Sequence, residues 1–259
     1  MNFQLETILL AIGLFCGMML LMELGRRIGQ ARKARDTETA HKGIGAIEGA
    51  VFALLGLIIA FTFSGALSRF NDRRLLIGKE SNAIGTAYLR VGLLPQQTQP
   101  EIQALFRRYV DVRWDTYHHM DDKAALHGKL AEANALQKEI WSKSLSACRR
   151  PDAPAQATLL MLPALNAMID ITTTRIVVTQ EHPPMVVFWL LCILALAGAL
   201  LAGYGMSESR VRSMIHMLFF AAAISITVFV IIDLEYPRSG LIRLDSADQV
   251  LYDLRNSMD

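Results

Sequence analysis

Charged residues are scarce in this sequence of 259 residues. Asp, Glu, Lys and Arg together make up 19% of the chain, against about 25% in an average soluble domain. The formal net charge is only +2, whereas a protein that binds nucleic acid through a basic face carries a clear excess of Lys and Arg. We therefore expect no nucleic-acid partner.

Cysteine is also scarce, since Cys16, Cys148 and Cys192 are the three in the chain. No two of them form a Cys-x-x-Cys pair, and none has the spacing from histidine that zinc sites use. The absence of these pairs and spacings excludes a disulfide-stapled secreted module, and it predicts three unpaired thiols. Cys148 lies outside the apolar parts of the chain, so it is the one thiol that we expect outside lipid.

Motifs for catalysis are absent. The sequence contains no Gly-x-Ser-x-Gly, no His-Glu-x-x-His and no phosphate-binding P-loop, which are patterns that place a nucleophile, a metal or a phosphate. We expect a protein that is not an enzyme and that uses no cofactor and no metal ion.

Apolar residues are in excess, at 53% of the chain. They are concentrated in four blocks, residues 8–22, 44–68, 185–203 and 214–232. A helix of about 20 apolar residues spans the hydrocarbon core of a bilayer, which is about 30 Å thick. The first block is short, but the residues before it lack the Lys or Arg of a secretory signal, so we expect it to stay as a membrane helix. A small soluble enzyme is excluded, and the lipid bilayer is the expected surrounding.

Basic residues in the short loops predict the orientation of the spans. Residues 25–43 contain six Lys or Arg, and Arg210 and Arg212 lie between the last two spans. These counts place both short loops in the cytoplasm, with both termini and residues 69–184 on the other side. A basic cluster at residues 69–79 argues against this, but long segments cross the membrane largely regardless of their charge.

The long segment between the second and third spans shows helical periodicity and no strand pattern. Apolar residues recur at spacings of three and four up to Val91, which predicts that the second span continues out of the membrane and ends near Gly92 and Pro95. We expect an all-α integral membrane protein with four transmembrane helices and a helical insert between the second and third. Its parts are a first span pair with a basic cytoplasmic loop, the soluble insert, a second span pair and a short acidic tail, at residues 1–68, 69–184, 185–233 and 234–259.

Small residues recur every three or four positions in the second span. A stripe of this kind lets helix backbones approach closely in lipid, and the third span has a similar stripe. The stripe has two interpretations: packing within the four-helix bundle, or the lining of a narrow pore around the axis of an oligomer. The candidate pore-lining residues are Gly49, Ala53, Gly56, Ala60 and Ser64.

Charged residues lie near both ends of this span. Glu48 is inside it, where an ionisable group is a functional candidate by default, although it can also reach the head groups or pair with Lys42. At the other end, Asp72 can pair with Arg69 three residues earlier. The basic residues there either bind lipid phosphate or form a ring at a pore mouth that attracts anions. The candidate mouth or interface charges are Glu48, Arg69, Asp72, Arg73, Arg74 and Glu80.

Polar residues along the helical insert are candidates for structural contacts between helices. Asp170 and Arg175 are five apart, a poor spacing for a pair within one helix, so we expect them to bind other helices, such as the extension of the second span. The full set of candidate polar contacts is Asn82, Asn166, Asp170, Arg175 and His182.

The layout and several motifs resemble the bacterial membrane family described as bestrophin-like, over nearly the whole chain. The stretches that carry the resemblance are residues 48–56 (EGAVFALLG), 60–64 (AFTFS), 69–74 (RFNDRR), 80–87 (ESNAIGTA), 165–170 (LNAMID), 182–184 (HPP), 201–205 (LAGYG) and 233–240 (DLEYPRSG), together with Arg175.

This resemblance implies a multi-pass protein of the bacterial inner membrane. Bestrophins themselves are pentameric anion channels with a cytoplasmic insert, which is opposite to the orientation that the loop charges predict here. The sequence also has no acidic calcium-binding clasp and no Trp-rich continuation after the second span. We expect a homo-oligomeric, pore-like protein that passes small ions, with anions favoured. The alternative is a non-conducting scaffold or sensor whose insert binds a partner.

Overall fold

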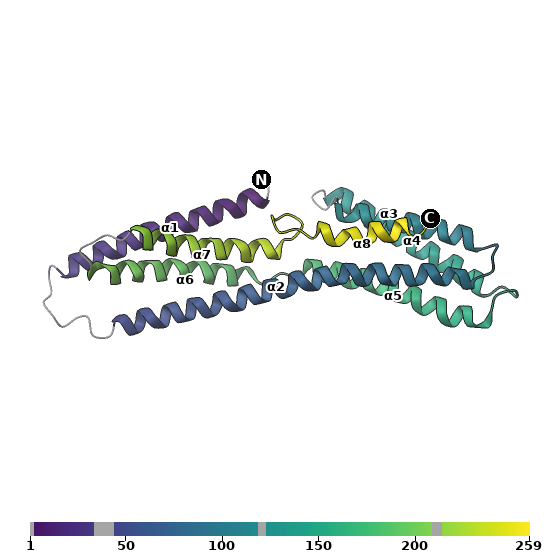
Figure 1. The fold of residues 1–259 in the computed structure, drawn as a ribbon, viewed down its shortest axis with the longest axis horizontal. Coiled ribbons are helices and arrows are strands. Elements are labelled where there is room, and N and C mark those ends of the chain that lie inside the picture. Colours follow the sequence, from purple (N-terminus) through teal and green to yellow (C-terminus); the bar gives the residue numbers. More distant parts are fainter. Residues whose placement is uncertain (1–2, 34–43, 119–122, 209–213) are drawn as a thin grey trace. The chain divides into compact units, whose positions relative to one another are not determined.

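A computed structural model describes residues 3–33, 44–118, 123–208 and 214–259. The regular structure of these residues is entirely helical, which confirms the predicted all-α class. In chain order the helices are α1 (Phe3–Lys33), α2 (Ile44–Arg90), η1 (Val91–Leu93), α3 (Gln99–His118), α4 (Lys123–Cys148), α5 (Ala155–Gln180), α6 (Met185–Gly205), η2 (Met206–Glu208), α7 (Met214–Glu235) and α8 (Asp245–Asn256) (Figure 1).

Four helical stretches in the described residues are long and apolar enough to cross a membrane. The four predicted apolar blocks lie in α1, α2, α6 and α7. Helix α2 continues well beyond its apolar block and ends at Arg90, which confirms the long helix predicted from the spacing. Of the basic residues that predict the orientation, Arg35, Lys42, Arg210 and Arg212 lie outside the described residues.

The chain divides into two compact units. Unit 1 contains Met1–Phe70 and His182–Ile242, and unit 2 contains Asn71–Glu181 and Arg243–Asp259. Unit 1 thus contains the four apolar blocks, and unit 2 contains the helical insert and the end of the chain. Each unit has its own cluster of buried apolar side chains.

The core of unit 1 depends on a close crossing of α1 and α6. A Cβ atom added at Gly203 would lie 2.0 Å from the carbonyl oxygen of Met22, and one added at Gly25 would lie 2.0 Å from that of Leu200. Only glycine allows the two backbones to approach this closely. Ala195 and Ala199 are fully buried on the same helix, so the small residues of the third span pack inside the bundle.

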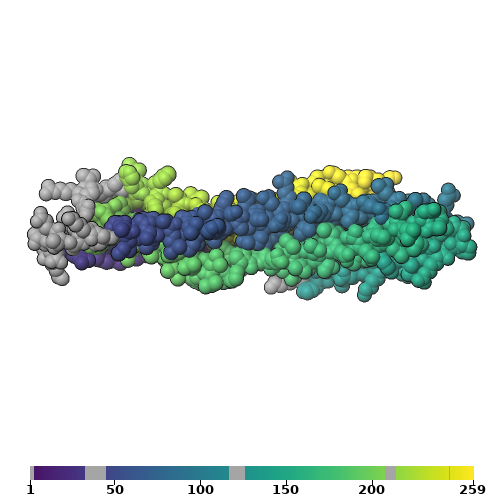
Figure 2. Space-filling view, turned by 90° about the horizontal axis from the view of Figure 1, so that it is seen from below, coloured from purple at the N-terminus to yellow at the C-terminus, as the bar shows by residue number. Residues whose placement is uncertain are grey.

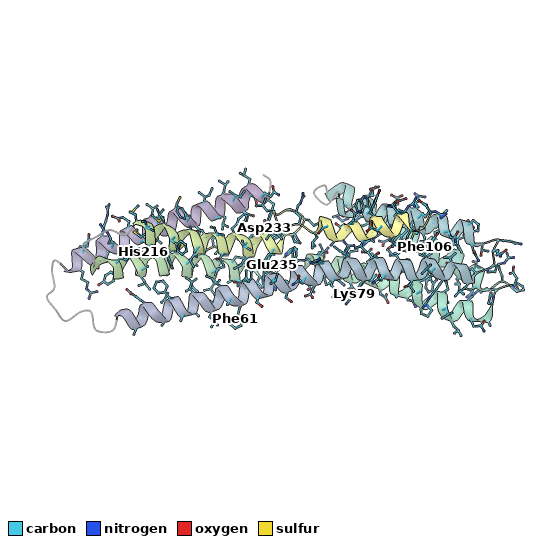
Figure 3. The ribbon with its side chains drawn as sticks, viewed as in Figure 1. Phe61, Lys79, Phe106, His216, Asp233 and Glu235 are labelled. Carbon is cyan, nitrogen blue, oxygen red and sulfur yellow. The ribbon has the colours of Figure 1, made fainter. Side chains whose placement is uncertain are left out.

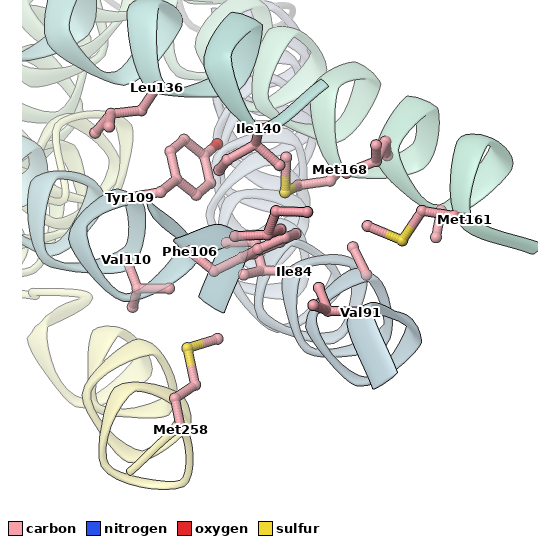
Figure 4. Close-up of a cluster of buried hydrophobic side chains, with 14 of the residues drawn as sticks. Ile84, Val91, Phe106, Tyr109, Val110, Leu136, Ile140, Met161, Met168 and Met258 are labelled. Carbon is pink, nitrogen blue, oxygen red and sulfur yellow. The ribbon is translucent and has the colours of Figure 1, made fainter. Parts of the chain in front are cut away.

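The core of unit 2 is built on Phe106 and Tyr109 of α3. Both side chains are fully buried, and Ile84, Ile140 and Met168 are buried beside them (Figure 4). These residues come from α2, α4 and α5, so one apolar cluster joins the main helices of the insert. The insert therefore has an apolar core of its own.

The C-terminal segment forms helix α8, whereas the sequence suggested only a short acidic tail. Leu251 and Met258 are buried in the core of unit 2, and Tyr88 donates a hydrogen bond of 2.8 Å to the carbonyl oxygen of Met258. Leu244, Asp248 and Leu251 recur at spacings of four and three on the buried side of this segment. Its acidic composition hid this helical periodicity.

Candidate functional site

The small-residue stripe of α2 is exposed in a single chain. Gly49 and Gly56 have no atom of another helix within 4 Å of the place where a Cβ would lie, and α2 is uncovered along the face drawn in Figure 2. The opposite side of the same segment, with Leu55 and Ala66, is buried in the core of unit 1. All five candidate pore-lining residues are exposed: Gly49, Ala53, Gly56, Ala60 and Ser64.

The stripe therefore makes no close helix crossing with the rest of the described chain. The close crossing in unit 1 uses glycines of α1 and α6 instead. Glu48, one residue before the stripe, packs against the end of α6, because a Cβ at Gly205 would lie 3.1 Å from Glu48 Oε2. Lys42, its suggested partner, lies outside the described residues.

Two arginines of the basic cluster that follows the apolar block of α2 are held by partners in the chain. Arg69 binds the buried carboxylate of Glu235 at 2.9 Å, rather than Asp72 as its spacing suggested. Arg73 is 4% exposed and donates to the carbonyl oxygen of Glu181 at 2.7 Å. Asp72, Arg74 and Lys79 are exposed, so these three of the clustered charges face outward.

Glu235 is the centre of a small polar site in unit 1. It is fully buried, and His182 Nδ1 lies 3.9 Å from its Oε2 atom. The His182 ring stacks on Tyr236 at 4.5 Å. A cavity of about 200 Å³ adjoins Arg69 and Glu235 and is otherwise lined mainly by apolar residues, including Phe61. Figure 3 marks Phe61 and Glu235. The sequence placed His182 among structural contacts but did not indicate Glu235 as its neighbour.

Unit 2 contains a buried group of four charged side chains. Glu80 is fully buried, and Arg113 donates to its Oε1 atom at 2.6 Å. Arg175 binds the other carboxylate oxygen of Glu80 and also binds Asp248 at 3.2 Å. Burial raises the pKa of Glu80, but the two guanidinium groups outweigh it and hold the pKa below its ordinary value. This charge cluster joins α2, α3, α5 and α8.

A neutral hydrogen-bond network lies next to the charge cluster on α3. Tyr109 shares a hydrogen bond of 3.1 Å with Thr172, and Gln137 donates to the Tyr109 hydroxyl at 2.8 Å. Tyr109 and Arg113 are one helical turn apart, so the two networks follow one face of α3. Buried polar groups that all find partners fix helices in one register.

The sequence indicated some members of these networks and missed others. Glu80 was a candidate mouth charge, but it is fully buried, and Asn82, Asn166 and Asp170 are exposed. Arg113 was missed, although its position four residues after Tyr109 on the apolar face of α3 was a usable indication. Asp248 was missed because the sequence suggested only a short acidic tail there.

In the described residues no group of three or more His, Cys, Asp or Glu side chains could hold a metal ion. The three cysteines are all unpaired, as predicted. Cys148, however, is 8% exposed and packs in the core of unit 2. Cys148 does lie outside the apolar blocks of the sequence, but packing in the core of unit 2 buries its side chain.

The chain resembles known proteins over most of its length. A family model described as the Bestrophin-like domain matches residues 12–248. Comparison with curated proteins gives no match.

Solved structures of a bacterial bestrophin homologue from Klebsiella pneumoniae match nearly the whole chain. One point mutant has 16% sequence identity and a TM-score of 0.67, covering 94% of this chain and 98% of that chain. A second point mutant has 15% identity and a TM-score of 0.66, covering 95% and 98%. A further structure has 15% identity and a TM-score of 0.63, covering 92% and 97%. At this identity the likeness establishes the fold.

Proposed function

Because the chain belongs to the bestrophin-like family, we propose that it forms a homo-oligomeric pore that passes small ions, with anions favoured. In this proposal the two span pairs, residues 1–68 and 185–233, form the membrane part, and the insert, residues 69–184, lies outside the lipid. The short acidic tail, residues 234–259, joins the insert through α8. The pore lies in a bacterial inner membrane.

The exposed small-residue face of α2 is the observation that supports this proposal. A single chain leaves Gly49, Gly56 and Ser64 uncovered, although small residues in a spanning helix usually serve close approach between helices. Several copies arranged with this face toward a common axis would place small side chains and the Ser64 hydroxyl around a narrow opening. Larger side chains at the same positions would close it.

The exposed charges near the opening would set the ion preference of the pore. Arg69 and Arg73 are held by Glu235 and by backbone carbonyl groups, so their role is to position helices. Arg74 and Asp72 are exposed on α2 and are the proposed mouth charges. Rings of charged side chains set the sign of the ions that a pore admits, and the preference for anions therefore rests on Arg74.

Ion flux in liposomes tests this function. The purified oligomer should release chloride from loaded vesicles, and Gly56→Trp should abolish the flux because an indole fills the axis. Leu54→Trp is the matched control, since Leu54 is 46% exposed on α2 but lies off the stripe. Arg74→Glu should shift selectivity toward cations. A folded oligomer without flux would contradict the pore and support a non-conducting scaffold whose insert binds a partner.

We also propose an orientation for the chain. Arg26, Arg27 and Arg32 lie at the C-terminal end of α1, and this basic end belongs in the cytoplasm by the positive-inside rule. The insert and both termini are then extracytoplasmic. The fold fits either orientation, so the loop charges alone support this one.

A further inference from the structure

Unit 1 contains a second hollow, formed by α1, α6 and α7. Its volume is about 590 Å³, within the range of about 300–1,000 Å³ that is usual for ligand pockets. Met22 and Met217 form its buried floor, and Ile215 and Phe219 are 80% and 76% exposed at its rim. We call this hollow the methionine groove.

The chemistry of the methionine groove suits an acyl chain. His216 is the one polar side chain among its lining residues, and Figure 3 places it on α7. Met22, Met206 and Met217 supply flexible thioether side chains that adapt to an irregular apolar ligand. Since α1, α6 and α7 are membrane-spanning helices, lipid is the solvent that reaches the exposed rim.

A cationic group lies one helical turn from the groove. Arg26 follows Met22 by four residues on α1, so the two side chains share a face of the helix. The Arg26 Nε atom is buried and makes no hydrogen bond within the described chain. Its ion-pair partner is Glu23, whose Oε2 atom lies 3.7 Å from Nε, which is beyond hydrogen-bond distance.

Arg26 shares its carboxylate partner Glu23 with Arg27. Arg27 donates to the other oxygen of Glu23 at 3.0 Å, so one carboxylate stands beside two guanidinium groups. Buried donors in folded proteins almost always have partners. Arginine near the end of a spanning helix reaches the level of the lipid head groups, where phosphate is the abundant acceptor.

We propose that the methionine groove binds one acyl chain of an anionic phospholipid and that Arg26 binds its phosphate. This lipid site does not depend on ion conduction, so it can stand or fall separately from the pore. The ligand class follows from an apolar groove in membrane helices and from the guanidinium of Arg26, whose Nε atom makes no hydrogen bond within the described residues.

Native mass spectrometry of the full chain in detergent tests the site. The protein is titrated with phosphatidylglycerol and with phosphatidylcholine that carry the same acyl chains. We expect stronger binding of phosphatidylglycerol to the natural protein. Arg26→Gln should weaken that binding about tenfold or more, the equivalent of one hydrogen bond to a charged group. Arg27→Gln is the matched control, because Arg27 is 73% exposed on its side chain, and it should bind as the natural protein does.

Filling the groove gives an independent test. Ala223 lines it and is exposed, so Ala223→Trp should remove bound lipid of both kinds, whereas Leu10→Trp, elsewhere on α1, should not. Equal binding of the two lipids by the natural protein, or equal effects of Arg26→Gln and Arg27→Gln, would overturn the proposal. Loss of oligomer without loss of lipid in Ala223→Trp would also overturn it and would assign the groove to a second copy. If Ala223→Trp does not fold, the two arginine variants decide.

Discussion

Buried charges in unit 2 decide how a single substitution acts. Glu80 neutralises two buried guanidinium groups, from Arg113 and Arg175. Removing one partner of such a group leaves charge uncompensated in the interior, which costs about 3–5 kcal/mol. Glu80→Gln should therefore lower the melting temperature of the detergent-solubilised protein strongly. Asp152→Asn, which breaks the exposed pair with Arg150, should change it little.

The stability of the folded protein should depend on pH through the carboxylate of Glu80. The pKa of Glu80 is lower in the folded protein than its ordinary value, so the unfolded chain binds a proton at a higher pH than the folded one. The stabilisation from Glu80 is complete above the unfolded pKa of about 4.3 and is lost as the pH falls through the folded value. Melting temperatures measured between neutral pH and pH 3 should fall more steeply for the natural protein than for Glu80→Gln. Parallel curves would contradict this assignment.

Cys148 should react slowly with thiol reagents in the folded protein. Its side chain is buried, and burial raises the pKa of the thiol, so little of the reactive thiolate is present near neutral pH. Maleimide labelling followed by mass spectrometry should show slow modification of Cys148 in the native protein and fast modification in denaturant. Fast native labelling would show that the thiol is not buried in the core of unit 2.

At the scale of the helix, the crossing of α1 and α6 should tolerate no side chain at Gly203. A methyl group there would meet the Met22 carbonyl oxygen at 2.0 Å, so the two helices must move apart. Gly203→Ala should destabilise unit 1 by about 1–3 kcal/mol, as overpacking does. Gly13→Ala is the control, because a Cβ at Gly13 meets nothing within 4 Å. Thermal unfolding in detergent compares the two, and equal melting temperatures would contradict the close crossing.

Helices were the part of the fold that the sequence predicted well. The four apolar blocks and the extension of α2 follow from local composition and from spacings of three and four, because helical hydrogen bonds are local. Helix α8 was missed because acidic residues between Leu244 and Leu251 disguised its apolar face. Its burial depends on a surface supplied by distant parts of the chain.

Partners of the charged residues were much harder to predict. The sequence suggested Asp72 for Arg69, but Glu235, which is 166 residues away, binds it. Asp248 lies 73 residues from Arg175. Rules for pairs three or four residues apart cannot find such partners. The exposed stripe of α2 was predictable as a pattern, whereas the absence of a close helix crossing at Gly49 and Gly56 required the structure.

At the scale of the whole molecule, orientation in the membrane is the property to measure first. A cysteine introduced at Ala131, exposed on α4, should react with a membrane-impermeant maleimide in intact cells if the insert is extracytoplasmic. A cysteine introduced at Gln30, exposed near the basic end of α1, should react only after lysis. Both variants should lack Cys148, so that the natural thiol of the insert does not contribute. The reverse pattern would place the insert in the cytoplasm.

The division of each unit between distant stretches of the chain has a consequence for biosynthesis. At about 5–20 residues/s, the ribosome needs about 4–15 s to add Asp248 after Arg175, since the two are 73 residues apart. Glu235 follows Arg69 after a still longer interval. During these delays Arg69 lacks Glu235, and Arg175 lacks Asp248, one of the two carboxylates that it binds in the finished fold. Translation that stops within α7 would release a chain that lacks both Glu235 and α8, and we expect cellular proteases to remove such a chain.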